Sequence, residues 1–181
     1  KTELMTFHPA SVEVPADAHV LVQIQNCSGI FFAGGDQTVL MQKIKTLNLK
    51  PVLQSLFRSG VVFAGTSAGT AIMSERMITG TGDPTVINAA QVPIDEGLGL
   101  LPQNTIVDQH FIVRQRFNRL AGLVVDGAGV QGLAVDEGMA AFVKNKSVSI
   151  YGPTQVLFFS KPAQKKIEVE FYAEGDSFQL P

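Results

Sequence analysis

The chain has 181 residues, of which 45% are hydrophobic and 17% are charged. This composition excludes a disordered protein and predicts a single domain with a packed core. Fourteen basic and 16 acidic residues give a formal net charge of −2, so the chain lacks the basic surplus that is typical of nucleic-acid-binding proteins. The single cysteine excludes a disulfide framework, and we expect neither a signal peptide nor a membrane span in these residues.

Two short apolar runs that end in glycine predict buried strands in the first third of the chain, at 29–35 and 60–65. Apolar spacing between these runs predicts a helix over 38–57 that is interrupted at Pro51. A further helix is predicted over 68–77. Runs that are apolar on both faces and alternate with helices are typical of parallel strands joined by crossover helices.

The second half of the chain begins with an apolar stretch at 100–107 that leads towards a further strand end. Helical spacing begins at Ile112 and continues to Gly127, and a short strand is predicted at 132–135. Alternating residues then predict antiparallel strands, at 148–151, 156–159 and 167–172. The predicted fold class is α/β, with a mostly parallel sheet flanked by helices and a β-rich C-terminal part.

The first signal of chemistry is Gly65-Thr-Ser-Ala-Gly69, which matches the pattern GxSxG. It lies between a predicted strand and a predicted helix, which is the setting that this pattern requires in order to present a nucleophile. Glycines on both sides leave room for a sharp turn in which Ser67 projects its hydroxyl beyond the strand. The alternative is a tight turn without chemistry.

A serine hydroxyl needs a base, and a base needs a group that orients it. His110 follows an apolar stretch and precedes a predicted helix, which places it at a strand end. Asp136 and Glu137 follow the strand at 132–135, and only one of them can readily face His110, because adjacent strand residues point to opposite sides. The sequence does not choose between the two acids. A helix-capping histidine and a solvated acidic turn are the alternatives.

Two further groups of residues suit an acidic or amide substrate. Gly34-Gly-Asp-Gln37 ends a strand and begins a helix, so its amides can contribute to an oxyanion hole and Gln37 can reach the substrate. Three arginines follow His110 closely, and arginine is suited to bidentate recognition of carboxylates; they are Arg114, Arg116 and Arg119. Ordinary turn formation and solvated arginines are the alternatives. The histidines are far apart and show no metal-ligand spacing, so we expect no metal site.

The ordered motifs resemble those of the cyanophycinase family; they are Gly34-Gly-Asp-Gln37, Gly65-Thr-Ser-Ala-Gly69, Asp108-Gln-His-Phe111 followed by Arg114-x-Arg116, and Asp136-Glu137. That family is grouped with aspartyl dipeptidase (peptidase E) among serine peptidases that have a class I glutamine amidotransferase-like α/β fold. The resemblance implies that Ser67 is the nucleophile, His110 the general base and Glu137 the residue that orients the histidine. Our candidates for the oxyanion hole are the backbone amides of Gly35 and Ala68. The resemblance also implies six residues that shape the substrate pocket: Gln37, Asp108, Gln109, Arg114, Arg116 and Arg119.

The same resemblance implies an activity. Cyanophycinases hydrolyse cyanophycin, a poly-aspartate that carries arginine on its β-carboxyl groups, and release β-aspartyl-arginine dipeptides. For this chain the resemblance implies an acidic or β-aspartyl peptide polymer as substrate, no cofactor and a homodimer. Some members of the family are intracellular and others are secreted; we expect a cytoplasmic protein, or a secreted one if a leader precedes these residues. An aspartyl or isoaspartyl dipeptidase and a noncatalytic binding protein of the same fold are the alternatives.

Two residues depart from the family pattern, namely Thr70 after the serine motif and Met139 after the acidic pair, and both bear on specificity more than on catalysis. The family's chains begin with further βα units, which nothing before Val20 supplies. We therefore expect residues 1–181 to form one α/β hydrolytic domain that lacks those units.

Overall fold

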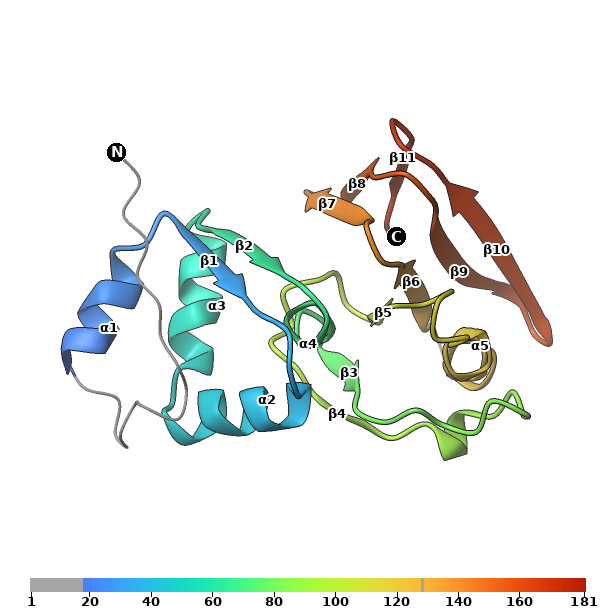
Figure 1. Cartoon of the computed structure of the whole chain (residues 1–181), viewed down its shortest axis with the longest axis horizontal. Helices are drawn as coiled ribbons and strands as arrows, with labels where there is room; N and C mark the ends of the chain where they lie inside the picture. Colours follow the sequence, from blue (N-terminus) through green and yellow to red (C-terminus); the bar gives the residue numbers. More distant parts are fainter. Residues whose placement is uncertain (1–17, 128) are drawn as a thin grey trace.

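The computed structural model describes residues 18–127 and 129–181 (Figure 1). Residues 18–71 contain four helices and two paired strands, which are α1 (Ala18–Gln25), β1 (Gly29–Phe32), α2 (Gln37–Thr46), α3 (Lys50–Arg58), β2 (Val62–Gly65) and α4 (Ala68–Ala71). Strands β1 and β2 pair in parallel, with Gly29 opposite Val62 and Phe32 opposite Gly65. Both strands were expected from their apolar runs, and their parallel pairing follows from the helices that connect them.

The helix predicted over 38–57 is two helices, α2 and α3. The interruption lies before Pro51, at the link 47–49, where Asn48 has a positive φ of 54°. Pro51 occupies the first turn of α3, where the missing backbone N–H has no intrahelical partner to lose. The proline therefore begins the second helix, and the prediction that it breaks a helix was wrong in position.

The helix predicted over 68–77 is also wrong in length, because α4 ends at Ala71. The chain then becomes β3 (Arg76–Ile78), which pairs antiparallel with β4 (Ile94–Glu96), and the 3-10 helix η2 (Ala89–Gln91) lies between these strands. The backbone amide of Leu98 donates to the Ile72 carbonyl over 2.7 Å. Pairing with this distant segment replaces the hydrogen bonds that would have continued the helix.

The second half is built around a four-stranded mixed sheet in the order β10, β9, β6, β5, where β5 is Thr105–Gln109, β6 Gln131–Val135, β9 Val156–Ala163 and β10 Lys166–Tyr172. Only β5 and β6 run parallel in it. A three-stranded antiparallel sheet lies beside it, formed by β11 (Ser177–Gln179), β8 (Ser147–Tyr151) and β7 (Ala140–Lys144). The prediction of a mostly parallel sheet was therefore wrong, because short turns join most C-terminal strands and favour antiparallel pairs.

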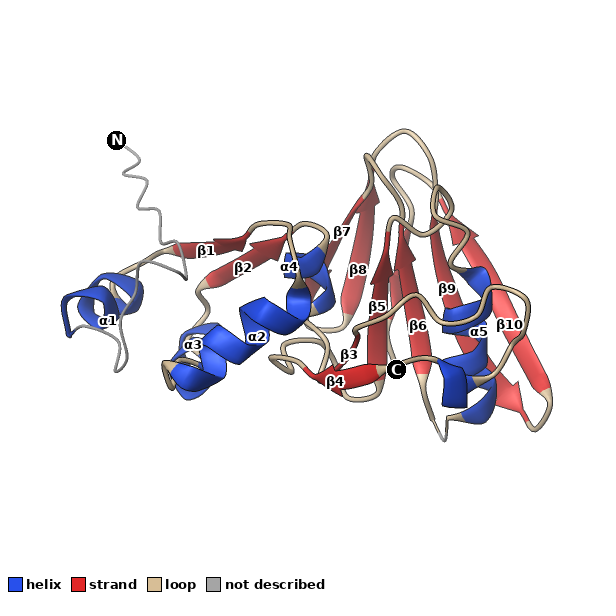
Figure 2. Ribbon diagram, turned by 60° about the horizontal axis from the view of Figure 1, so that its bottom comes forward, coloured by secondary structure: helices blue, strands red, loops and turns tan. Residues whose placement is uncertain are grey.

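Helix α5 (Phe117–Asp126) covers one face of the mixed sheet (Figure 2). Leu120 and Val124 of α5 pack there against Ile106, Ala134 and Phe159. The opposite face buries a second set of strand residues against β8 and β11, including Val107, Leu133, Phe158, Ile150 and Leu180. The helix begins five residues later than the spacing from Ile112 predicted, because the segment after His110 first forms turns. Burial on both faces fixes the carboxyl ends of β5 and β6 relative to each other.

A separate core lies under β1, β2, α2 and α3, and its most buried members are Met41, Leu53, Ile72, Met77 and Leu98. Helix α4 contacts β1, β2 and β5, so it links this half of the molecule to the mixed sheet. The carboxyl ends of β2, β5 and β6 consequently supply the residues described next. No helix in the described part of the chain is long and apolar enough to cross a membrane.

Candidate active site

Ser67 lies in the turn between β2 and α4 and has φ 52° and ψ −115°, a backbone conformation that few residues other than glycine adopt. The two glycines of the motif permit this turn because, without side chains, they let neighbouring backbone segments approach closely. A Cβ on Gly65 would lie 2.4 Å from the carbonyl carbon of Gly69, and a Cβ on Gly69 would lie 2.1 Å from the Phe32 carbonyl oxygen. The Thr70 hydroxyl also donates to the Gly65 carbonyl over 2.8 Å, so this departure from the family pattern ties the turn together.

Three side chains from three strand ends form a continuous hydrogen-bonded line. His110 Nε2 lies 3.0 Å from Ser67 Oγ, and His110 Nδ1 lies 2.7 Å from Glu137 Oε1. With the imidazole proton on Nδ1, the histidine donates to Glu137 and accepts from the Ser67 hydroxyl. In this arrangement the histidine can take a proton from the serine while the carboxylate holds the ring in place.

The two neighbouring acids have separate contacts. Glu137 reaches the imidazole of His110, whereas Asp136 Oδ1 accepts from the backbone amides of Ile112 and Val113 over 3.2 and 3.3 Å. The residue pattern left open which acid faces the histidine, the family resemblance implied Glu137, and Glu137 is the acid that contacts the imidazole. The contacts of Asp136 could not be predicted from the sequence, because its partners are backbone amides in the segment that follows β5.

The glycine pair after β1 lies beside the serine turn. A Cβ on Gly34 would lie 3.4 Å from Ser67 Cβ and 3.9 Å from Ser67 Oγ, and Gly35 has a positive φ of 141°. Ala68, on the other side of Ser67, begins α4, where the first backbone amides of a helix have no intrahelical acceptor. Gly35 thus directly follows the residue that lies against Ser67, and Ala68 directly follows Ser67 in the chain.

Gln37 was expected to reach the substrate. In the structure its side-chain Nε2 donates to the Ile78 carbonyl over 2.8 Å, so the amide ties the start of α2 to β3. Asp36 caps the same helix by accepting from the backbone amides of Thr38 and Val39. The Gly34-Gly-Asp-Gln37 segment thus has local structural roles as well as proximity to Ser67.

Asp108 and Arg119 form a buried ion pair between β5 and α5. Arg119 Nε donates to Asp108 Oδ2 over 2.7 Å, Arg119 Nη2 pairs with Asp108 Oδ1, and both side chains are almost fully buried. Arg119 Nη1 also donates to the Gly80 carbonyl over 2.8 Å, so one guanidinium joins three segments. Both residues were expected in the substrate pocket, and the structure instead engages them with the protein itself.

Arg116 is partly buried and donates through Nη1 to the Gln109 carbonyl over 2.5 Å. Its pKa is lowered from the ordinary value, first by burial and then by the charge of Arg119, while Asp108 opposes the change. Gln109 is buried, and its side-chain Oε1 has no hydrogen-bond partner among the described residues. Arg114 is exposed. Of the predicted pocket residues, Arg114 is the one that is exposed, whereas the Gln109 amide oxygen is enclosed by the protein.

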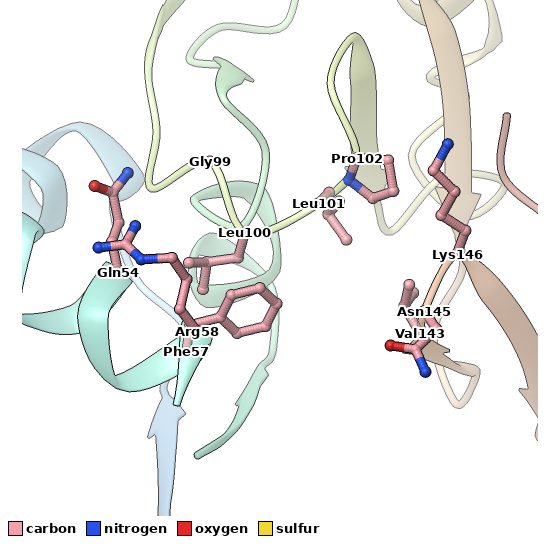
Figure 3. Close-up of a pocket in the computed structure, with 10 residues that line it drawn as sticks. All are labelled: Gln54, Phe57, Arg58, Gly99, Leu100, Leu101, Pro102, Val143, Asn145 and Lys146. Atoms are coloured by element: carbon pink, nitrogen blue, oxygen red, sulfur yellow. The ribbon is translucent and has the colours of Figure 1, made fainter. Parts of the chain in front are cut away.

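A cavity of about 430 Å³ lies elsewhere, between α3 and the turn that joins β7 to β8 (Figure 3). It is lined by ten residues, none of which was a predicted site residue: Gln54, Phe57, Arg58, Gly99, Leu100, Leu101, Pro102, Val143, Asn145 and Lys146. Ser67, His110 and Glu137 do not line it. Among the residues that the structure describes, no group of three histidine, cysteine or acidic side chains is arranged to hold a metal ion.

The sequence model of Peptidase family S51 matches residues 6–151 of this chain. Cyanophycinase from Trichormus variabilis is 34% identical over 181 residues, which cover 90% of this chain and 60% of that protein. Cyanophycinase from Geminocystis herdmanii is 34% identical over 131 residues, covering 71% of this chain and 48% of that protein. The chain thus spans about three fifths of the length of the first of these relatives.

Two solved structures resemble the fold. A peptidase from an acI-B1 Actinobacterium superposes with a TM-score of 0.65 at 20% identity and covers 90% of this chain and 63% of its own. A putative peptidase E protein from Listeria monocytogenes superposes with a TM-score of 0.56 at 14% identity, with coverage of 79% and 69%. At these identities the likeness concerns the mixed α/β fold alone.

Proposed function

The chain belongs to peptidase family S51, and on that premise we propose that it acts as a serine peptidase on cyanophycin, multi-L-arginyl-poly-L-aspartate, and releases β-Asp-Arg dipeptides. The observation that carries the proposal is the hydrogen-bonded line from Ser67 Oγ through His110 to Glu137 Oε1. Its substrate class is supported by the 34% identity to proteins named cyanophycinase.

The proposed reaction proceeds through an acyl-enzyme. Ser67 Oγ attacks an aspartyl carbonyl carbon of the polymer backbone while His110 Nε2 takes the hydroxyl proton. The peptide C–N bond then breaks, and His110 returns the proton to the leaving amine. Water, deprotonated by the same imidazole, hydrolyses the ester and restores the serine hydroxyl. Glu137 keeps the proton of neutral His110 on Nδ1 and stabilises the imidazolium that forms in each step.

The sharp turn at Ser67 acts in this proposal as a nucleophile elbow, and the three residues act as a catalytic triad. The backbone amides of Gly35 and Ala68 bind the oxyanion of the tetrahedral intermediate, where preorganised donors are most effective. The position of Gly34 against Ser67 supports this role for its neighbour.

Substrate recognition is proposed to come from the segment after His110. Arg114 is exposed and charged, which suits it to an aspartate carboxylate of the polymer. Gln109 is buried beside His110 and contributes to the wall of the pocket. Asp108, Arg116, Arg119 and Gln37 shape the pocket through their contacts within the protein.

The test of the proposed function compares Ser67→Ala with Ser59→Ala, a control at an exposed serine just after α3. Purified cyanophycin is the substrate, and mass spectrometry reads the products. We expect β-Asp-Arg dipeptides from the unsubstituted protein and from Ser59→Ala, and none from Ser67→Ala. A fluorophosphonate probe should label the first two proteins at Ser67 and leave Ser67→Ala unlabelled.

Parallel incubations with Asp-X and β-Asp-X dipeptides distinguish the substrate classes. If the protein cleaves these dipeptides and leaves cyanophycin intact, the proposed function is wrong and the protein is an aspartyl or isoaspartyl dipeptidase. If the protein binds cyanophycin but neither cleaves it nor is labelled by the fluorophosphonate, it is a noncatalytic binding protein of the same fold.

We extend the proposal to the whole molecule in three respects. Residues 1–181 act as one hydrolytic domain with a class I glutamine amidotransferase-like relationship, which is supported by the strand–turn–helix around Ser67. The protein is a homodimer, as the family resemblance implies, and its proposed location is the cytoplasm. Light scattering coupled to size-exclusion chromatography should give twice the monomer mass, and a monomer mass at micromolar concentration would reject the dimer.

A further inference from the structure

Asp136 makes contacts that the proposed reaction does not use. It is the residue after β6, and its side chain is partly buried beside the turn that follows His110. One carboxylate oxygen, Oδ1, accepts from two consecutive backbone amides, those of Ile112 and Val113. Two N–H donors on one oxygen fix the turn at a single point.

The turn that Asp136 holds begins at a strained residue. His110 has a positive φ of 50°, a conformation that is uncommon for residues with a side chain. Immediately afterwards the chain coils back, because the amide of Arg114 donates to the His110 carbonyl over 3.0 Å and that of Arg116 donates to the Phe111 carbonyl over 2.9 Å. The amides of Ile112 and Val113 point out of the start of this coil, as the first amides of a helix do, and need an outside acceptor.

Strand register explains why Asp136 can be that acceptor. Strands β5 and β6 are parallel, with Gln109 opposite Val135, so the residues that follow them, His110 and Asp136, leave the sheet side by side. Asp136 then holds the backbone after the histidine, and Glu137 holds its ring through Nδ1. The backbone amide of Met139 donates to the Asp136 carbonyl over 3.2 Å, which closes the turn that carries both acids.

We propose that Asp136 is a positioning residue for His110: by accepting from the amides of Ile112 and Val113 it holds the histidine's strained backbone so that Nε2 stays within reach of Ser67 Oγ. This inference rests on the proposed function, because it assigns Asp136 a task in that reaction. The two acids therefore hold the histidine at two points: Asp136 fixes the main chain that follows it, and Glu137 fixes its ring.

The experiment compares Asp136→Ala and Asp136→Asn with Asp176→Ala. The asparagine keeps a side-chain oxygen that can accept both amides, whereas the alanine removes the acceptor. Asp176 is a matched control, because it also accepts a backbone amide, that of Ala173, in a turn between β10 and β11. The readouts are kcat and KM on cyanophycin, the rate of Ser67 labelling by a fluorophosphonate, and hydrogen exchange at the amides of Ile112 and Val113.

We expect Asp136→Ala to lower kcat and the labelling rate by roughly tenfold to a hundredfold, with KM little changed, because small displacements of a catalytic group have effects of this size. Exchange at Ile112 and Val113 should accelerate in the same variant. Asp136→Asn should restore slow exchange and most of the rate, and Asp176→Ala should match the unsubstituted protein. The asparagine variant tests whether Asp136 acts as a hydrogen-bond acceptor or through its negative charge.

Two results would overturn the inference: unchanged exchange at Ile112 and Val113 in Asp136→Ala, or kcat and labelling equal to those of Asp176→Ala. An asparagine variant as slow as the alanine variant would also reject it, since the acceptor alone would not then suffice. Failure of the proposed function has a different signature. The unsubstituted protein would then neither cleave cyanophycin nor label at Ser67, although hydrogen exchange would still distinguish Asp136→Ala from Asp136→Asn.

Discussion

At the scale of single residues, the space around Ser67 is set by backbone packing. Gly69 allows the start of α4 to contact the Phe32 carbonyl of β1, and Gly65 allows β2 to contact Gly69. Both glycines are needed because the neighbouring atoms are main chain, which cannot move aside as a side chain can. The GxSxG pattern therefore reports a steric requirement of the turn.

Gly69→Ala should destabilise the protein by about 3 kcal/mol, because the added Cβ would overlap the Phe32 carbonyl oxygen. Gly29→Ala is the matched control in the adjacent strand, since its Cβ would make only an ordinary contact at 3.6 Å; a change within about 0.5 kcal/mol is expected. Urea unfolding followed by circular dichroism measures both. Equal stability of the two variants would contradict the steric account.

Glu137→Gln should lower kcat by about a hundredfold with little change in stability. The glutamine amide can donate to His110 Nδ1 and so stabilises the tautomer that carries its proton on Nε2, which cannot accept from Ser67. Glu174→Gln, in an exposed turn, is the control. Steady-state kinetics on cyanophycin gives the comparison, and full activity of Glu137→Gln would remove Glu137 from the proposed triad.

At the scale of elements, the buried pair of Asp108 and Arg119 joins β5 to α5 and reaches the Gly80 carbonyl beyond β3. Removing one partner of a buried pair leaves a desolvated charge, so Arg119→Met should destabilise the protein by about 3 to 5 kcal/mol. The exposed pair of Lys166 and Glu168 is the control, and Glu168→Gln should cost less than about 0.5 kcal/mol. Urea unfolding would contradict this role if Arg119→Met were as mild as Glu168→Gln.

A second connection between elements involves charge at the surface. Glu96 of β4 pairs with Lys50 at the start of α3 and with Lys45 near the end of α2. Hydrogen bonds from Lys50 and then from Lys45 are the main causes that hold the pKa of Glu96 below its ordinary value of 4.5. A carboxyl group with a lowered pKa stabilises the folded state above its unfolded pKa, and this contribution is lost as pH falls through the folded pKa.

Glu96→Gln should therefore reduce stability by about 0.5 kcal/mol at pH 7, a small effect because the side chain is half exposed. The difference from the unsubstituted protein should shrink as the pH is lowered below 4.5. Urea titrations at several pH values measure it. A difference that stays constant into acid would show that the carboxylate charge is not its source.

At the scale of the whole molecule, α4 links the core under β1, β2, α2 and α3 to the mixed sheet, which has a buried cluster on each face. These separate clusters make it necessary to test whether the whole chain unfolds cooperatively. Natural probes lie in both parts. The single cysteine, Cys27, lies between α1 and β1, and the two tyrosines, Tyr151 and Tyr172, lie on C-terminal strands. If residues 1–181 are one domain, thiol exposure and tyrosine fluorescence should follow the same urea transition. Separate midpoints would divide the chain into two domains.

Much of the site was accessible to sequence analysis because its signals are local. Glycine spacing marked the turn at Ser67, and apolar runs placed Ser67 and His110 at strand ends, where the structure brings them to 3.0 Å. The limits of helices were less accessible. The segment after Ala71 has helical apolar spacing, yet its carbonyl groups pair with residues near Leu98, a partner that periodicity does not reveal.

The sequence by itself determined an α/β chain with a serine turn, a histidine and an acidic pair in a fixed order, because glycine geometry and apolar runs act over a few residues. Tertiary structure alone decided that Asp136 holds the turn after His110 and that Asp108 and Arg119 neutralise each other in the interior. The residue pattern left both acids open, the family resemblance implied Glu137, and the fold brings Glu137 to the imidazole of His110. The physical reason is that hydrogen-bond and ion-pair partners are set by which strands and helices lie next to each other in the folded chain, and local sequence patterns do not specify those neighbours.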